Sequence, residues 1–525
     1  MARRVVTLSA FVFLIGAIFF LSRRSTQLPL PPAYSPNGAN EPFSLAAFYT
    51  GVPYTSSWGS WWHPQRLRPT GSGLIGKGWN LLYHLGGNGP WIEKVDGVVE
   101  GGIGTPDECV VDQVHMMSRH AERFPTKAVG GRMLDLLDRM RSQKTKLKGD
   151  LEFVNSWEYF TSEQLTTTGP FAGTLEAFTT GVKLRTRYDH LVGTSSASPK
   201  TNFWASDCDR VIDTARYFGA GFFGLDWEST AKLHVIPETE DRGGNTLTPG
   251  DTCVKYRTDL KRGHDHGAEM LAKFRATYLP AIADRLEKQN PHIRFTDAEI
   301  YSMQETCGFE TLVRGSSRWC DVFSRKEWEN FEYARDVIHF YRAGPGNPYG
   351  PTMGHLWLNA TTNLLRAGPT AGPLFFSLSA TSPTPSNITQ LTPPSVHDGD
   401  IVPLLAAVAL PTPLSPTDLP ITHRPTHNPY ETSQLVPMGG RIIFERLTCS
   451  SRSSSRHSSP PAVAVRVNIN DGVVAIPGCD TGPGRSCPLE EFEALVERRG
   501  REVGDFRKVC GLGGDSEAAI GFLHQ

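Results

Sequence analysis

Apolar and polar residues recur with different spacings along this 525-residue chain, and the spacings predict strands and helices. An apolar-rich run, Val110–Met117, predicts a buried strand. After Pro125, apolar side chains recur at helical spacing and predict an amphipathic helix: Met133, Leu136, Leu137 and Met140. Short apolar runs at Leu374–Leu378 and Ala462–Ile469 predict two further strands.

Residues from about 150 to 345 are predicted to be mainly helical, because their apolar positions follow a helical period. The helices expected in this part are Gly173–His190, Arg210–Phe218, Ala268–Glu287 and Lys326–Tyr341. Two more are expected at Pro351–Leu365 and Ile401–Leu410. Strands on both sides of a helix-rich stretch favour an α/β body that carries an inserted, smaller helical lobe.

Shifts in composition give the expected domain boundaries. Residues 1–24 form a targeting segment, 25–80 a linker and N-terminal extension, and 81–150 the first part of the α/β body. Residues 151–345 form the helical lobe and 346–525 the second part of the body. Within this last part, Ser379–Ser395 is rich in Ser, Thr and Pro without periodicity, so residues 379–395 are interpreted as an atypical insertion.

The N-terminus predicts entry into the secretory pathway. An apolar run, Val5–Leu21, lies between two pairs of arginines. The run is long for a cleaved signal and slightly short for a spanning helix, so a signal peptide and a membrane anchor both stay open. The protein is expected to be secreted or extracellular, or else a single-pass membrane protein with its catalytic part outside. Sequons at Asn359 and Asn387 and the nine cysteines fit an oxidising compartment.

Composition excludes other classes. The net charge is −1 and no basic face dominates, so no nucleic-acid partner is expected. There is no Cys-x-x-Cys pair, and His264-Asp265-His266 is read as a polar loop, so no metal site is expected. Cys479 and Cys487 bracket a short loop that a disulfide can close, and Cys307 and Cys320 offer the same. The odd cysteine count leaves at least one thiol unpaired or paired between chains.

The candidate chemistry centres on Arg119-His120-Ala121-Glu122-Arg123-Phe124-Pro125, directly after the first predicted strand. A neutral imidazole between two guanidinium groups suits attack on a phosphorus atom whose oxygens the arginines hold. Positive neighbours also disfavour protonation of His120, so its pKa is expected to fall. Taken alone, the same residues would also fit a solvated basic surface.

Three residues farther along could complete such a site. Arg210 begins a predicted helix and offers a third guanidinium, although an exposed helix arginine is the simpler reading of it alone. His397 offers a further cationic group and Asp398 a carboxylic acid for a leaving alcohol. A lone His-Asp pair could instead cap the next helix.

Together these motifs, in this order, resemble the histidine acid phosphatases, in the branch that includes fungal phytases. The resemblance rests on four stretches: Leu81–Trp91, Ser118–Thr126, Ser206–Ala215 and Val396–Leu405. It extends from about Leu81 to Cys510 and is closest to the fungal acid phosphatases and 3-phytases. It implies a phosphoglycerate-mutase-like α/β body with a smaller helical lobe, and a site between the two.

The resemblance also implies roles for matched positions. His120 would become a phosphohistidine, Arg119, Arg123, Arg210 and His397 would bind the phosphate, and Asp398 would protonate the leaving oxygen. It implies no metal or organic cofactor, and a small phosphomonoester as the partner. It would pair Cys109 with Cys449, Cys253 with Cys510, Cys307 with Cys320 and Cys479 with Cys487, which leaves Cys208 as the odd thiol.

Two departures from the family pattern bear on activity. The family usually has Gly where Ala121 stands, and a methyl group there would strain the loop if positive φ were required. The 379–395 insertion precedes His397, and either a real loop or an intron retained in the gene model would explain it.

The expected function is hydrolysis of phosphomonoesters, with phytate among the candidate substrates. A weakened, tethered or secreted glycoprotein that binds phosphorylated ligands without turnover is the alternative, and a phosphate-transferring mutase is a more remote one. Oligomeric state, including a homo-oligomer, stays open.

Overall fold

The computed structural model describes residues 75–76, 79–160, 164–193, 199–379, 401–410, 418–428, 430–450 and 462–525. The chain divides into two units, Met1–Val52 and Pro53–Gln525, and every described residue lies in the second. The targeting segment 1–24, Asn387, His397, Asp398 and all of the 379–395 stretch except Ser379 lie outside the described residues.

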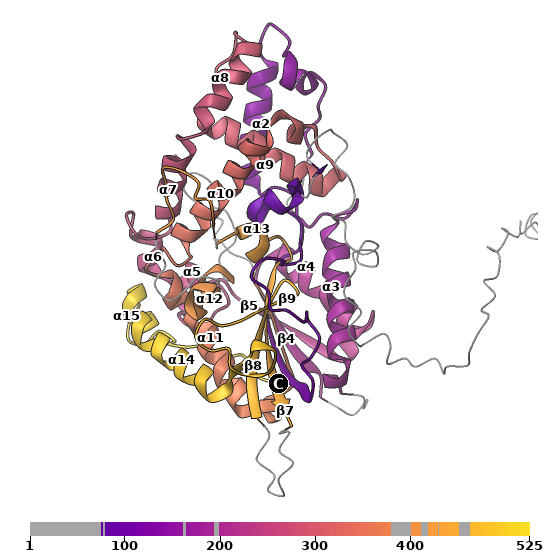
Figure 1. Ribbon diagram of the computed structural model, residues 1–525, viewed down its shortest axis with the longest axis vertical. Coiled ribbons are helices and arrows are strands. Elements are labelled where there is room, and N and C mark those ends of the chain that lie inside the picture. The colour runs from indigo at the N-terminus through magenta and orange to yellow at the C-terminus, as the bar shows by residue number, and fades with distance from the viewer. Residues whose placement is uncertain are drawn as a thin grey trace, which may run out of the picture. The chain divides into compact units, whose positions relative to one another are not determined.

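A mixed sheet forms the centre of the body, with strands in the order β10-β8-β7-β3-β6-β4-β5 and β9 paired to β8 (Figure 1). Its strands are β3 (Cys109–Arg119), β4 (Thr201–Ser206), β5 (Ala231–Ile236), β6 (Leu374–Ser379), β7 (Arg441–Cys449), β8 (Ala462–Ile469), β9 (Gly472–Val474) and β10 (Cys487–Pro488). A separate pair, β1 (Ile75–Gly76) and β2 (Trp79–Asn80), precedes it.

The parallel half of this sheet brings four strand ends to one edge. Strands β3, β6, β4 and β5 are parallel to one another, whereas β7 pairs antiparallel with both β3 and β8. Arg119 pairs with Ser379, and Ser206 pairs with Ile236, so the chain leaves all four strands at the same side. The carboxyl ends of parallel strands are where ligands bind in open α/β sheets.

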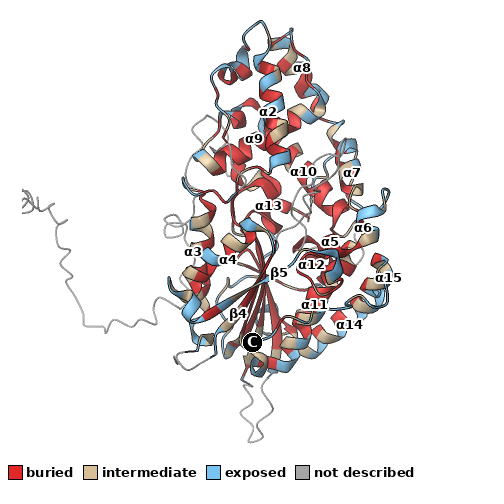
Figure 2. Ribbon diagram, turned by 180° about the vertical axis from the view of Figure 1, so that it is seen from behind, coloured by how far each residue is buried: buried red, intermediate tan, exposed pale blue. Residues whose placement is uncertain are grey.

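Both faces of the sheet are covered by helices, which explains why its central strands are mostly buried (Figure 2). Residues alternate between the faces, as the two-residue period of a strand requires. Met116 of β3 and Phe376 of β6 belong to the core under α3 (Gly173–Tyr188) and α4 (Asp209–Phe223). The neighbouring Met117 and Phe375 join the larger core, which includes α11 (Gly350–Ala367), α12 (Ile401–Val408) and α14 (Leu489–Val503).

A helical region lies beyond one end of the sheet (Figure 1). Its helices are α2 (Lys127–Arg141), α7 (His266–Arg275), α8 (Leu279–Gln289), α9 (Asp297–Arg314) and α10 (Arg325–Arg342). Capping boxes begin α9, at Thr296, and α10, at Ser324. The short helices are α5 (Pro249–Thr252), α6 (Val254–Thr258), α13 (Thr432–Leu435) and α15 (Phe506–Cys510).

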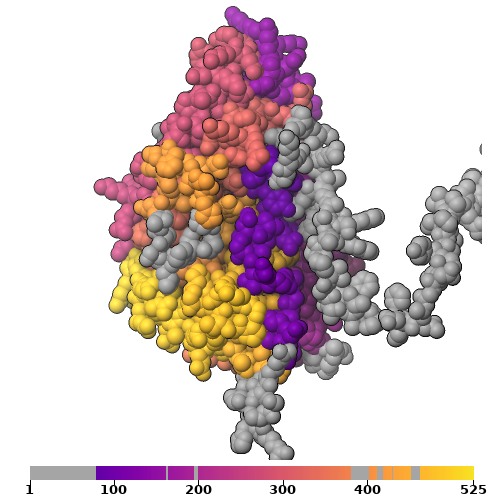
Figure 3. All heavy atoms as spheres, viewed as in Figure 1, coloured from indigo at the N-terminus to yellow at the C-terminus, as the bar shows by residue number. Residues whose placement is uncertain are grey.

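The segment between β2 and β3 lies along the body. In Figure 3 this indigo segment crosses one face of the molecule beside the yellow C-terminal part. Lys94 N–H donates to Asn470 O at 3.0 Å, and Val99 N–H donates to Val473 O at 2.8 Å. The segment therefore lies against the loop and strand that follow β8.

The structure differs from the sequence-based expectations at several elements. Ala268–Glu287 was expected as one helix but forms α7 and α8, because Pro280 lies in the first turn of α8 and cannot donate a helical hydrogen bond. Strands β4 and β5 lie inside the range 151–345, which was expected to be mainly helical, and α3 and α4 cover the sheet. Strand β7 was not anticipated at all.

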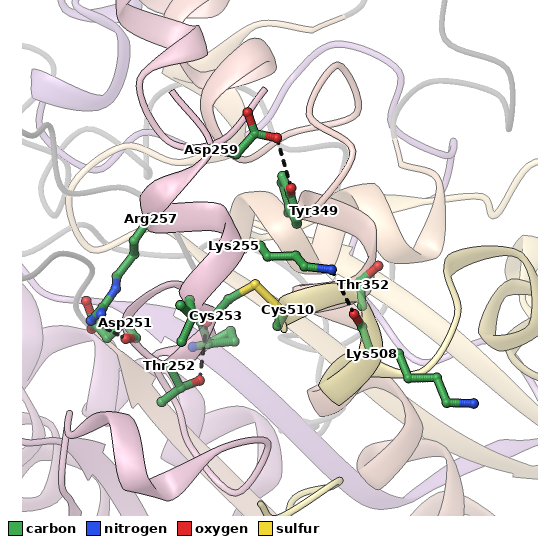
Figure 4. The surroundings of a disulfide bond; sticks show 12 residues. Asp251, Thr252, Cys253, Lys255, Arg257, Asp259, Tyr349, Thr352, Lys508 and Cys510 are labelled. Atoms are coloured by element: carbon green, nitrogen blue, oxygen red, sulfur yellow. Dashed lines mark hydrogen bonds between the residues drawn. A yellow bond between two sulfur atoms is a disulfide. The ribbon is translucent and has the colours of Figure 1, made fainter. Parts of the chain in front are cut away.

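Eight of the nine cysteines form four disulfides, the same pairs that the resemblance implies: Cys109–Cys449, Cys253–Cys510, Cys307–Cys320 and Cys479–Cys487. Cys208 is the free thiol. Figure 4 shows Cys253–Cys510, which joins the start of α6 to the end of α15. Beside it, Lys255 Nζ donates to Lys508 O at 3.4 Å.

In the part of the chain that is described, no helix combines the length and the apolar character needed to cross a membrane.

Candidate functional site

The site is built around the turn that follows β3. This strand ends at Arg119, and His120 is the next residue, at the edge where the four parallel strands end. Arg119 N–H donates to Gly440 O and Gly439 N–H donates to His120 O, both at 2.8 Å. The backbone of the turn is therefore held on both sides of the histidine by the segment that leads into β7.

The His120 imidazole has a defined orientation. Its Nδ1 lies 2.8 Å from Ala121 O. Because a carbonyl oxygen only accepts, Nδ1 carries the proton in this hydrogen bond and Nε2 keeps its lone pair. Arg123 Nε lies 3.3 Å from Nε2 and donates to it. Nε2 is thus the ring nitrogen that directs its lone pair towards Arg123.

The surroundings of His120 keep it neutral. Burial is the largest cause that lowers its pKa well below the usual value, and the positive charges of Arg119, Arg123 and Arg210 lower it further. The hydrogen bond to Ala121 opposes this shift. The predicted fall in the pKa is therefore confirmed, although desolvation contributes more than the arginines that the sequence pointed to.

The three arginines are held in different ways. Arg119 Nη1 donates to Gly87 O and Val436 O, each at 2.7 Å, so two loops orient its guanidinium. Arg123 Nη1 donates to Phe124 O at 2.8 Å, and the guanidinium carbon lies 5.6 Å from the Phe309 ring centre. Arg210 Nε is buried and has no hydrogen-bond partner. A buried donor without a partner is costly, and an anion would satisfy it.

Helix α4 carries Arg210 to the site. Ala121 N–H donates to Thr214 Oγ1 at 3.1 Å, and that hydroxyl donates to Arg210 O at 2.6 Å. A single threonine thus connects the turn after His120 to the first turn of α4. The role of Thr214 is not visible in the sequence, because it depends on a contact between segments about 90 residues apart.

Ala121 fits without strain. It is fully buried, and it is absent from the described non-glycine residues with positive φ. Its methyl group packs in a small apolar cluster with Leu165 and Ala177. The conditional expectation of a strained loop therefore does not apply to this chain.

Glu122, whose role the sequence alone did not indicate, anchors the backbone at Trp91 and at Thr166. Its Oε1 accepts the Trp91 N–H at 2.8 Å, and its carbonyl accepts the Thr166 N–H at 3.0 Å. Burial, with the nearby Glu176 carboxyl, raises the pKa of Glu122. Gly173 is required where α3 begins, since a Cβ there would lie 1.9 Å from Glu122 O.

The remaining candidates lie elsewhere or serve structure. His397, Asp398 and Asn387 lie outside the described residues. Asn359 is exposed on α11. Burial raises the pKa of the Cys208 thiol. His264 Nδ1 lies 3.1 Å from Asp265 Oδ1, and the described residues contain no cluster of three or more metal-ligating side chains.

Comparison with known proteins gives a consistent result. A model of the histidine phosphatase superfamily (branch 2) matches residues 110–468. An acid phosphatase of Komagataella pastoris is 33% identical over 83% of this chain and 87% of its own length, and a phytase of Candida albicans is 33% identical over the same shares. The crystal structure of the phytase from D. castellii matches with a TM-score of 0.73 and 27% identity, covering 86% of this chain and 94% of that one.

Proposed function

Because this chain belongs to branch 2 of the histidine phosphatase superfamily and is an enzyme that hydrolyses phosphomonoesters, we propose that it does so through a phosphohistidine on Nε2 of His120. The observation that carries the proposal is the hydrogen bond from Nδ1 to Ala121 O, which leaves Nε2 as a lone-pair donor among arginines. The depressed pKa keeps this nitrogen nucleophilic in acid.

The reaction has two displacement steps. In the first, Nε2 forms a bond to phosphorus as the ester P–O bond breaks, and Asp398 gives its proton to the leaving oxygen. Arg119, Arg123, Arg210 and His397 neutralise the phosphoryl oxygens. In the second, water attacks the phosphohistidine, Asp398 takes a proton from that water, and inorganic phosphate leaves with His120 restored. The role of Asp398 rests on the family pattern.

The proposed substrates are small phosphomonoesters, including phytate. Support for phytate comes from the phytases of C. albicans and D. castellii among the similar proteins. The four disulfides and the exposed Asn359 support a secreted glycoprotein, and a form tethered through residues 1–24 is the alternative.

The decisive test measures phosphate release from p-nitrophenyl phosphate and phytate at acidic pH by the chain lacking residues 1–24. We expect His120→Ala to reduce turnover to background, and rapid acid-free quenching of the wild type to trap phosphate on His120. Turnover that persists in His120→Ala would refute the nucleophile. A folded wild type that binds phosphate without releasing it from esters would instead support the ligand-binding alternative.

Asp398→Asn tests the proton donor separately. General acid catalysis contributes about 10²–10⁴-fold, and most where the leaving group is poor. We therefore expect a loss of that size on glycerol phosphate and a much smaller loss on p-nitrophenyl phosphate. Equal losses on both esters would argue against Asp398 as the acid.

A further inference from the structure

The end of β5 adds one more side chain to the edge that holds the site. His120 follows β3, residues 380–400 with Asp398 follow β6, and Arg210 lies just after β4. The fourth parallel strand, β5, ends at Ile236, and Glu238 lies two residues beyond it. None of the roles assigned so far uses a residue from this strand end.

Backbone contacts place Glu238 next to the start of α4. Ser206 pairs with Ile236, and Asp207 N–H donates to Ile236 O at 3.0 Å. The Glu238 carboxyl makes a hydrogen bond with the Ser206 side chain. The carboxyl therefore lies beside the β4–α4 turn that presents Arg210.

Two polar atoms at this place are buried without hydrogen-bond partners. They are Oε1 of Glu238 and Nε of Arg210. Although the two side chains are close enough to influence each other electrostatically, these atoms do not bond to each other. A native structure seldom leaves such atoms unsatisfied, so a bound ligand that pairs with both is the simplest explanation.

We infer that Glu238, in its protonated form, donates a hydrogen bond from Oε1 to an oxygen of the substrate phosphate, beside the Nε–H of Arg210. This inference rests on the proposed function and adds a residue from the fourth strand end to its phosphate site. The ionised carboxylate would repel the phosphate and draw Arg210 towards itself instead.

The charges around Glu238 favour the protonated form in acid. Burial is the main cause that raises its pKa to about 7, Asp251 and Asp207 raise it as well, and Ser206 and Arg210 lower it. The Cys208 thiol also lies within electrostatic range. Burial raises the pKa of Asp251 to about 6. At acidic pH both carboxyls are therefore neutral and leave the arginine charges unopposed.

Affinity for the phosphate group should consequently fall as the pH rises through 7. If only the protonated form binds, apparent affinity falls in proportion to its population, by about 30-fold at pH 8.5. The Glu238→Gln variant keeps a neutral donor at every pH and should bind with nearly constant affinity.

The test is calorimetric titration of the folded protein with sulfate from pH 5.5 to 8.5, because sulfate stays a dianion throughout. We expect the wild type to lose affinity by about 30-fold over this range and Glu238→Gln to lose less than about threefold. Glu240→Gln, an exposed carboxylate two residues away, is the matched control and should follow the wild type. Asp251→Asn should shift the loss to lower pH, because it removes a charge that raises the pKa of Glu238.

The same pH dependence in Glu238→Gln and the wild type would overturn the inference. Proton uptake by the wild type gives a measurement independent of any variant. At pH 7.5, sulfate binding should take up about 0.8 proton, measured from the buffer dependence of the binding enthalpy, and no uptake would also overturn it. Neither readout requires turnover, so His120→Ala can fail or pass its own test without changing this result.

Discussion

His115 lies on β3 and His120 directly follows it. Both are fully buried, yet their imidazoles differ in their hydrogen bonding. His120 bonds through both ring nitrogens. Neither ring nitrogen of His115 has a hydrogen-bond partner, and the ring stacks on Phe375 with centroids 4.5 Å apart. Burial lowers the pKa of His115 to about 3. His120 is oriented by hydrogen bonds at both ring nitrogens, whereas His115 packs in the core as a neutral ring because burial lowers its pKa.

This arrangement predicts a stability cost in acid. The folded pKa of His115 lies below the unfolded value, so the unfolded chain binds more protons below about pH 6.5, and the free energy of unfolding falls as the pH drops towards 3. Between pH 7 and pH 4, the free energy of unfolding should decrease by about 3 kcal/mol less in His115→Leu than in the wild type. Urea unfolding at the two pH values measures this difference. The exposed His423→Gln variant is the control, and an unchanged slope in His115→Leu would contradict the account.

At the scale of elements, the site depends on how α4 docks against the turn after β3. A hydrogen bond from the Ala121 N–H to Thr214 Oγ1 joins them in a buried environment. The apolar contacts of α4 with the sheet fix the helix as a whole. The threonine fixes the distance between His120 and Arg210 more finely than those non-directional contacts do.

Thr214→Val should therefore impair phosphate binding. The change keeps the volume but leaves the Ala121 N–H buried without an acceptor, which costs about 1–3 kcal/mol of stability. We expect KM for p-nitrophenyl phosphate to rise and the urea midpoint to fall. Thr362→Val on α11 is the matched control, because its hydroxyl donates only to Leu358 O of its own helix, at 2.7 Å. Equal effects of the two substitutions would argue against a positioning role for Thr214.

At the scale of the whole molecule, disulfides join parts of the chain that are far apart in sequence. Cys109 and Cys449 are 340 residues apart and link the start of β3 to the end of β7. Cys253 and Cys510 are 257 apart and tie the C-terminal helices to the loop region after β5 (Figure 4). Such crosslinks restrict the unfolded chain most when the closed loop is long, in the chain-entropy account.

Replacing both Cys253 and Cys510 with serine should lower the free energy of unfolding by about 2–4 kcal/mol. Phosphatase activity at ambient temperature should persist, since neither cysteine belongs to the site. Cys208→Ser is the control and should change stability little, because this thiol forms no disulfide. Chemical denaturation without reductant measures both. A loss in Cys208→Ser as large as in the double variant would show that the crosslink is not the cause.

The sequence predicted the elements whose apolar period was clear and uninterrupted. Strand β8 was predicted with its exact bounds, and α11 to within two residues at its ends. The expected helix Ala268–Glu287 was wrong in one respect, since the apolar period continues across a break that Pro280 imposes. Strands β4 and β5 were missed because short strands next to long helices leave little periodic signal, and β7 was missed although it has nine residues.

By itself, the sequence determined the family through motifs that follow one another in order, and it predicted His120 as the nucleophile because Arg119, His120 and Arg123 stand within five residues of one chain segment. Local spacing was enough to predict a neutral imidazole among guanidinium groups. Only the tertiary structure decided which ring nitrogen of His120 faces Arg123 and where Arg210, Thr214 and Glu238 lie relative to the ring. Those positions follow from the parallel order of β3, β6, β4 and β5, which brings distant strand ends to one edge and which no local pattern of residues encodes.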